Sequence, residues 1–169
     1  KFYSELYAKL FIELDKQFTM VHIFNKVLEN YMDLFKPIDI IHCKDYNTFC
    51  ELTKKNEQKL AVSNFFTNLM IFNYISTDII MDILNKLQSN VDNLLDKDNN
   101  NLIDQLSENI YSIIQTGKEK LTNHTEWDIL YLKIVNITKL KKEQNKGLTH
   151  KSKFKYMDIL DLFKQNKDK

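Results

Sequence analysis

Glycine and proline are almost absent from this sequence, which holds two glycines and one proline among 169 residues. A β-sandwich or β-barrel needs a turn about every ten residues, and those turns draw heavily on glycine and proline. Helices joined by a few connections need far fewer of either residue. The sequence therefore predicts an all-α fold.

Apolar side chains recur every three or four residues along most of the chain, the spacing that places them on one face of an α-helix. Residues 39–56 are less periodic, with a short helix expected around Phe49, and the Asn- and Asp-rich residues 89–101 predict a loop. We expect most of the eleven phenylalanines and eight tyrosines to lie in the core. The predicted helices span residues 2–16, 19–35, 57–73, 77–88, 102–117, 125–144 and 151–162.

Local signals predict several helix ends. Gly117 is expected to end the helix that begins at residue 102, and Gly147 to stop the one that follows. Thr125-Glu-Trp-Asp128 resembles a capping box with Asp in place of Glu, which would open that helix. Its apolar stripe is expected to include Ile129 and Leu132.

Seven helices with modest connections fit either a bundle or a stack of helical hairpins. The helix pairs at residues 57–88 and 102–144 each occupy about 40 residues, the length of a HEAT or armadillo unit. We therefore expect one domain over residues 1–169, a right-handed solenoid of antiparallel helix pairs, with a bundle as the alternative. The chain opens at Lys1 without a methionine, so we expect a fragment.

The chain contains no motif of an enzyme, a metal site or a cofactor site that we can identify. It has no Gly-rich phosphate loop, nucleophile elbow or His-Glu-x-x-His sequence, so we expect a protein that is not an enzyme. His42, Cys43 and Cys50 lack a fourth ligand at zinc-finger spacing, and two cysteines favour a reduced, cytoplasmic compartment. No apolar run approaches the roughly 20 residues that span a bilayer, so no membrane partner is expected.

The basic residues are the remaining candidates for a binding site. All 24 are lysine, so each cationic contact is a point charge without the bidentate geometry of arginine. One interpretation is a solvated face, a second is a patch that contacts RNA phosphates, and a third is a docking surface for an acidic protein. The residues assigned to RNA binding on this basis are Lys139, Lys141, Lys142 and Lys146.

The segment Lys151-x-Lys153-Phe154-x-x-x-Asp158-Ile-Leu-Asp161-Leu resembles the closing-helix signature of the middle (MIF4G-type) domain of eukaryotic translation initiation factor 4G. That family has arginine at the two basic positions. Three earlier segments are similar to other family helices and occur in the same order. They are Tyr3-Ser4 with Tyr7-Ala8 and Leu10, Phe65-Phe66-x-Asn68-Leu69 followed by Tyr74-Ile75, and Ile113-Ile114-Gln115-Thr116-Gly117-Lys118-Glu119.

The resemblance implies a HEAT-repeat solenoid that lacks its N-terminal repeat and acts as a scaffold in translation initiation. It implies binding and stimulation of a DEAD-box RNA helicase of the factor 4A type, with mRNA, other initiation factors and a cap-binding protein outside this fragment as further partners. Related domains serve mRNA decay, splicing and nuclear cap binding, and these roles stay open, as does RNA binding without a helicase. Carried over by position, the helicase-contacting residues are Lys151, Lys153 and Phe154, with Asp158 and Asp161 in support.

Overall fold

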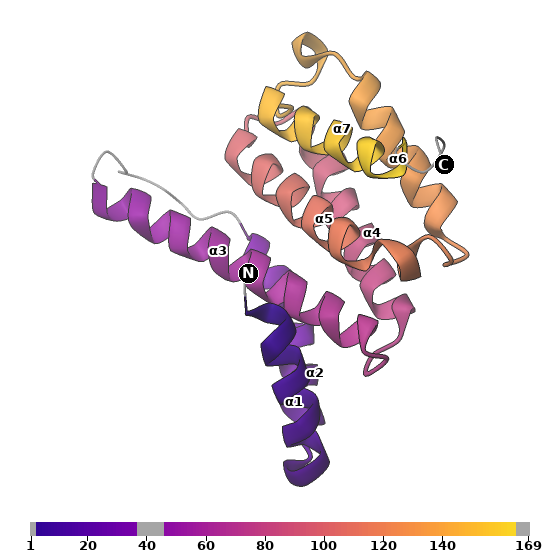
Figure 1. Ribbon diagram of the computed structural model, residues 1–169. Coiled ribbons are helices and arrows are strands. Elements are labelled where there is room, and N and C mark those ends of the chain that lie inside the picture. The colour runs from indigo at the N-terminus through magenta and orange to yellow at the C-terminus, as the bar shows by residue number, and fades with distance from the viewer. Residues whose placement is uncertain (1–2, 37–45, 165–169) are drawn as a thin grey trace. The chain divides into compact units, whose positions relative to one another are not determined.

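The computed structural model describes residues 3–36 and 46–164, with the backbone alone for residues 46–49 and 142. Every regular element in these ranges is an α-helix or a 3₁₀-helix, which confirms the predicted all-α fold (Figure 1). The solenoid arrangement remains a prediction. The chain divides into two compact units, Lys1–Tyr74 and Ile75–Lys169, which are described in turn.

The N-terminal unit contains α1 (Ser4–Phe18), α2 (Val21–Glu29), the 3₁₀-helix η1 (Tyr31–Phe35) and the long α3 (Tyr46–Ile71). The predicted helix over residues 19–35 is interrupted at Asn30, whose side-chain amide donates to the carbonyl of Lys26 at 2.7 Å. Such local hydrogen bonds compete with helix propagation. In contrast, the short helix expected around Phe49 and the helix predicted from residue 57 form one continuous α3, in agreement with the absence of glycine and proline between them.

Aromatic side chains hold α1 and α2 against α3. Phe11 on α1 makes edge contacts with Phe65 and Tyr74, each at 5.6 Å between ring centroids. The Tyr74 hydroxyl donates to the Asp15 carboxylate at 2.8 Å, and Phe24 on α2 packs on Phe66 at 5.5 Å. These contacts use only one side of α1.

Several apolar residues that recur every three or four positions along α1 are not in the core. Tyr3, Leu6, Tyr7 and Leu10 are exposed, whereas Ala8, between them in sequence, is buried. The expectation that these tyrosines belong to the core is therefore wrong. Residue spacing correctly indicates an amphipathic helix but does not tell which face meets α3.

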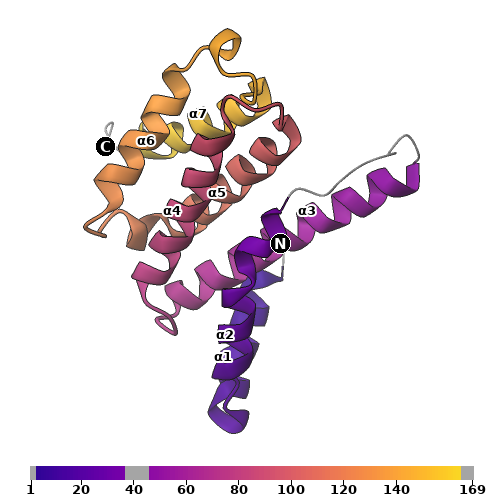
Figure 2. The same cartoon turned by 180° about the vertical axis from the view of Figure 1, so that it is seen from behind.

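The C-terminal unit contains α4 (Thr77–Leu94), α5 (Asn100–Leu121), α6 (Trp127–Lys139), the 3₁₀-helix η2 (Lys142–Gln144) and α7 (His150–Lys164). Helices α4 and α5 form an antiparallel hairpin, and α7 packs against both α5 and α6 (Figures 1 and 2). The core is mostly aliphatic, with Trp127 and the fully buried Tyr156 as its aromatic members. Its fully buried aliphatic members include Ile80, Leu84 and Leu87 on α4 and Ile103, Leu106 and Ile110 on α5.

Two predicted helix ends lie further along the chain than expected. Helix α4 continues to Leu94, because Val91 stays in register with Leu84 and Leu87 and is fully buried despite its Asn- and Asp-rich surroundings. Helix α5 runs through Gly117 to Leu121, which is also fully buried. A glycine inside a helix costs about 1 kcal/mol relative to alanine, and burial of one leucine contributes about 2 kcal/mol, so the helix can continue.

The expectation that Gly147 ends the helix before it is wrong, because α6 already ends at Lys139. Gly147 lies in the loop before α7, where there is no space for a side chain. A Cβ atom at this position would lie 2.3 Å from the Leu94 carbonyl oxygen and 2.7 Å from that of Lys97. The Gly147 N–H donates to the Leu95 carbonyl at 2.8 Å. The loop that follows α6 is thereby held against the turn between α4 and α5.

Candidate protein-interaction site on α6 and α7

Helix α7 begins at a reciprocal cap between Thr149 and Ser152. The Ser152 N–H donates to the Thr149 hydroxyl at 2.9 Å, and the Thr149 N–H donates to the Ser152 hydroxyl at 3.0 Å. This is the capping-box arrangement with serine in the place usually taken by glutamate. The expected box at Thr125 is wrong, since α6 begins after Glu126 without a side-chain cap.

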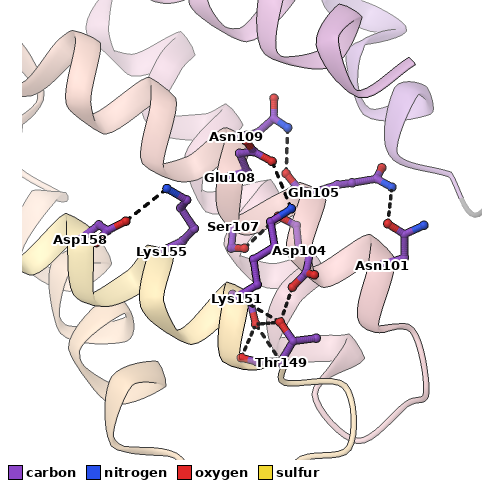
Figure 3. A network of polar contacts seen from close by, with 11 residues as sticks. Asn101, Asp104, Gln105, Ser107, Glu108, Asn109, Thr149, Lys151, Lys155 and Asp158 are labelled. Atoms are coloured by element: carbon purple, nitrogen blue, oxygen red, sulfur yellow. Dashed lines mark hydrogen bonds and ion pairs between the residues drawn. The ribbon is translucent and has the colours of Figure 1, made fainter. Parts of the chain in front are cut away.

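The cap is tied to α5 by the carboxylate of Asp104, which accepts a hydrogen bond from the Thr149 hydroxyl (Figure 3). One turn further along α5, Glu108 lies 3.8 Å from the ammonium of Lys151. Lysines at a helix N-terminus are unfavourable by a few tenths of a kcal/mol, and carboxylates there are favourable by a similar amount. The two acidic side chains of α5 therefore offset the basic start of α7.

Lys153 and Lys155 are held by contacts within the unit. The Lys153 ammonium donates to the Leu140 carbonyl at 2.8 Å, at the C-terminal end of α6. The Lys155 ammonium lies 4.6 Å from the centre of the Tyr111 ring and 3.2 Å from the Asp158 carboxylate. Both lysines are half-buried, so Lys151 is the most exposed cation in this part of α7.

The C-terminal end of α7 is fixed by aromatic contacts. Phe163 lies 5.3 Å from Trp127 and 5.6 Å from Tyr131, both on α6. The Lys118 ammonium lies 5.0 Å from the Phe163 ring centre and donates to the Leu162 carbonyl. Contacts at both ends therefore fix the position of α7 within the C-terminal unit.

Four large hydrophobic side chains are exposed on the outer sides of α6 and α7. Ile129, Leu132, Phe154 and Met157 are 61%, 59%, 60% and 43% exposed, and they are the only exposed large hydrophobic residues among the described residues of the C-terminal unit. They lie on the sides of their helices opposite the buried residues, which are Trp127, Leu130, Ile134 and Ile137 on α6 and Ser152, Tyr156 and Ile159 on α7. We call these four exposed residues the α6–α7 face.

The sequence predicts only part of this face. Phe154 is expected to contact a partner, and it is exposed. The assignment of Ile129 and Leu132 to the inward stripe of α6 is wrong, because the core is formed instead by residues that include Trp127 and Leu130. The period of three and four fits more than one choice of buried face on such an apolar helix.

The two acidic residues of the predicted helicase site form local ion pairs. Asp158 pairs with Lys155, and Asp161 pairs with Lys164 at 2.9 Å. The hydrogen bond and negative charge of Asp161 raise the pKa of Lys164 above its usual value. Each of the two acidic residues therefore has a basic partner on α7 itself.

The lysines predicted to bind RNA lie at the end of α6 and in the loop between α6 and α7. Lys139, Lys141 and Lys146 are exposed and make no ion pair with any described residue, whereas the side chain of Lys142 lies outside the described part. The Gly147 contact also places the α4–α5 turn, with Lys97 and two acidic residues at positions 96 and 98, beside this loop. The surroundings of the lysines are therefore of mixed charge.

Other parts of the chain offer few further sites. Among the side chains that the structure describes, no group of three or more His, Cys, Asp and Glu residues is placed to hold a metal ion. Cys50 is a half-buried free thiol, and His42 and Cys43 lie outside the described residues. In the described ranges, none of the helices combines the length and apolar character that crossing a bilayer requires.

In comparisons with known proteins, no family model, no curated protein and no solved structure matches this chain.

Proposed function

We propose that this chain is a non-catalytic, HEAT-like helical scaffold that binds and stimulates a DEAD-box RNA helicase of the factor 4A type during cytoplasmic translation initiation. The observation that carries the proposal is the exposed α6–α7 face. Two residues of this face, Phe154 and Met157, lie on α7. The sequence of α7 resembles the closing helix of the factor 4G middle domain, and the resemblance implies that this helix contacts the helicase.

The contacts of α7 divide the five predicted helicase residues by role. Phe154 and Lys151 are exposed and suited to contact a partner, Phe154 as an apolar anchor and Lys151 as a charge. Buried aromatic anchors account for much of the binding energy in protein interfaces. Lys153 instead stabilises the α6–α7 connection, and Asp158 and Asp161 neutralise neighbouring lysines.

The proposal is tested by measuring binding to a factor 4A-type helicase and the ATPase rate of that helicase with and without the chain. We expect Phe154→Asp to weaken binding by tenfold or more, because loss of an interface anchor typically costs about 2 kcal/mol. Ile23→Asp is the matched control, since Ile23 is also an exposed large hydrophobic residue on a helix but lies on α2. Equal binding by the two variants, or no binding by the unmodified chain, would reject the proposal.

Scaffolds of mRNA decay, splicing or cap binding are the alternatives within the same class. They would use the same face for a different partner, so a panel of helicase paralogues and cap-binding proteins separates them. Preferential binding to a helicase other than the factor 4A type would favour one of these roles over translation initiation.

Direct RNA binding is a second candidate, and the exposure of Lys139, Lys141 and Lys146 without ion pairs to described residues favours it. Lysine–phosphate contacts release counterions, so the logarithm of RNA affinity should fall linearly with the logarithm of salt concentration. Replacing these three lysines by glutamine should flatten that dependence by a slope of about 2 to 3. An affinity unchanged by the substitutions would exclude this site.

A further inference from the structure

Helix α1 carries an apolar face that no described part of its own unit covers. Tyr3, Leu6, Tyr7 and Leu10 are 66%, 60%, 59% and 49% exposed, and Phe18 at the end of the helix is 67% exposed. In contrast, Ser4, Ala8 and Phe11 face α3, where the Ser4 hydroxyl donates to the Ala61 carbonyl. The two sets lie on different sides of α1, so packing against α3 leaves the apolar face free. We call Tyr3, Leu6, Tyr7, Leu10 and Phe18 the α1 face.

The side of α1 beyond this face is charged, in the order Glu5, Lys9, Glu13 and Lys16. Within one chain, Lys9 pairs with Glu5 at 2.6 Å and Lys16 with Glu13 at 2.7 Å. If a second copy of α1 lies antiparallel to the first, with Leu10 near the centre of both, each acidic residue of one copy lies level with a basic residue of the other or one residue away from it. Glu5 then corresponds to Lys16, and Lys9 lies within one residue of Glu13.

We propose that the α1 face binds the α1 face of a second copy of this chain, with the two helices antiparallel about a two-fold axis beside Leu10. Such an isologous interface brings the same surface of both copies together. Tyr3 of one copy then lies towards Phe18 of the other, and Tyr7 lies towards Leu14. The two copies of Leu10 meet near the axis, so apolar side chains face one another along the length of the helix.

Electrostatics selects the antiparallel orientation. With the two apolar faces in contact, antiparallel helices place both charged sides on the same side of the pair, with each Lys9 close to a Glu13. Parallel helices would place the charged side of one copy next to the α3-facing side of the other, which lacks this series of alternating charges. Opposite charges at positions flanking an apolar helical seam set partner choice and orientation.

The area of the face predicts a weak association. Five side chains exposed by half to two-thirds offer roughly 100 Å² each, so roughly 500 Å² is buried per copy. Stable complexes bury about 800 Å² per partner, and smaller interfaces are usually transient. The dimer should therefore form reversibly as the concentration of the chain rises.

Sedimentation velocity of the full chain over a concentration series tests the proposal. We expect the average mass to rise towards twice that of one chain, and Leu10→Glu to abolish that rise while circular dichroism and melting temperature stay unchanged. A mass that stays at one chain at every concentration overturns the proposal and leaves the face to a different partner. Self-association that persists in Leu10→Glu overturns it too, because another surface is then responsible.

A charge-swap experiment tests the orientation. In a Lys9→Glu dimer, each new glutamate would lie close to Glu13 of the other copy. In a Glu13→Lys dimer, each new lysine would lie close to Lys9 of the other copy. Like charges repel in both cases, so neither variant should self-associate. In an equimolar mixture of the two variants, the new acid of one chain faces the new base of the other, and the unsubstituted Lys9 and Glu13 form the second pair. The dimer should therefore return, and failure of the mixture to associate overturns the antiparallel pairing.

The matched control for the charge swap is Lys86→Glu. Lys86 forms a similar exposed helical ion pair with Asp82, but it lies on α4. This variant should dimerise like the unmodified chain. Loss of self-association in Lys86→Glu would show that any added negative charge suppresses it, which would overturn the assignment to α1.

Discussion

The hydroxyl of Thr149, at the start of α7, donates a hydrogen bond to the carboxylate of Asp104 on α5. Forty-five residues separate the two in sequence. The same Thr149 hydroxyl accepts the N–H of Ser152, so one side chain both caps α7 and attaches it to α5. This contact therefore fixes the start of α7 against α5.

Thr149→Val should destabilise the chain by about 1 to 2 kcal/mol, because it removes the helix cap and one partner of a part-buried carboxylate. Urea unfolding followed by circular dichroism measures the change. Thr125→Val is the control, since Thr125 is exposed and α6 has no side-chain cap, and it should alter stability by less than about 0.5 kcal/mol. Equal effects of the two substitutions would show that the Thr149 cap contributes little.

Gly147→Ala should destabilise the chain by about 1 to 3 kcal/mol, the usual cost of forcing atoms into a filled space. The added methyl group would meet two backbone carbonyl oxygens, neither of which can turn aside as a side chain could. Lys146→Ala, one residue earlier and exposed, is the matched control. Thermal unfolding measures the melting temperatures of both variants. An unchanged melting temperature for Gly147→Ala would contradict the close contact between residue 147 and the α4–α5 turn.

The fold class is predictable because it depends on composition and periodicity, which are local properties. The scarcity of glycine and proline argues against sheets, and the apolar repeats locate most helices. The ends of α4 and α5 differ from prediction because Val91 and Leu121 are buried by tertiary packing that outweighs an unfavourable local sequence. These contacts join distant segments, so no local signal reveals them.

The candidate site is predictable only in part, for the same reason. The resemblance points to Phe154, but the contact between Thr149 and Asp104 joins distant segments and leaves no mark in either one. The Thr-x-x-Ser sequence at the start of α7 is the one local signal that indicates the cap. The exposed positions of Leu6 and Ile129 cannot be predicted either, because periodicity does not show which face of a helix has a neighbour.

Alkaline pH should destabilise the N-terminal unit through Tyr74. Burial, the hydrogen bond to Asp15 and the negative charge of Asp15 together raise the pKa of Tyr74 to about 12. The pKa in the unfolded chain is about 10. Because the folded state favours the neutral phenol, its contribution to stability is complete below pH about 10 and is lost as the pH rises towards 12.

The ultraviolet absorbance of tyrosinate, recorded alongside circular dichroism, follows this transition. Asp15→Asn removes the charge beside Tyr74 and should move its titration to lower pH. Tyr3→Phe is the control, since Tyr3 lies at the opposite end of α1 from Asp15. A Tyr74 that ionises near pH 10 in the folded chain, about the value of a free tyrosine, would contradict the effect of burial.

Substitutions at Lys151 and Lys153 should distinguish an effect on helicase binding from an effect on the free energy of unfolding. Lys153→Met removes the hydrogen bond to the Leu140 carbonyl and should destabilise the chain by about 1 kcal/mol, because that hydrogen bond is part-buried. Lys151→Met should change stability by less than about 0.5 kcal/mol, since the 3.8 Å contact with Glu108 is exposed and surface ion pairs contribute little. Urea unfolding of the two variants measures both changes.

Measuring the helicase affinity of variants at Lys151 and Lys153 shows whether either side chain contributes to binding. If Lys151 contacts an acidic surface of the helicase, Lys151→Glu should weaken binding more than Lys151→Met does, because it replaces an attraction by a repulsion. The unfolding curves of these two variants should nearly coincide, so a difference in affinity reports the contact and not the fold. Lys153→Met should bind with nearly unchanged affinity under conditions where it is fully folded, since its ammonium is occupied by the Leu140 carbonyl. Unaffected binding by Lys151→Glu would place the helicase contact elsewhere on the chain.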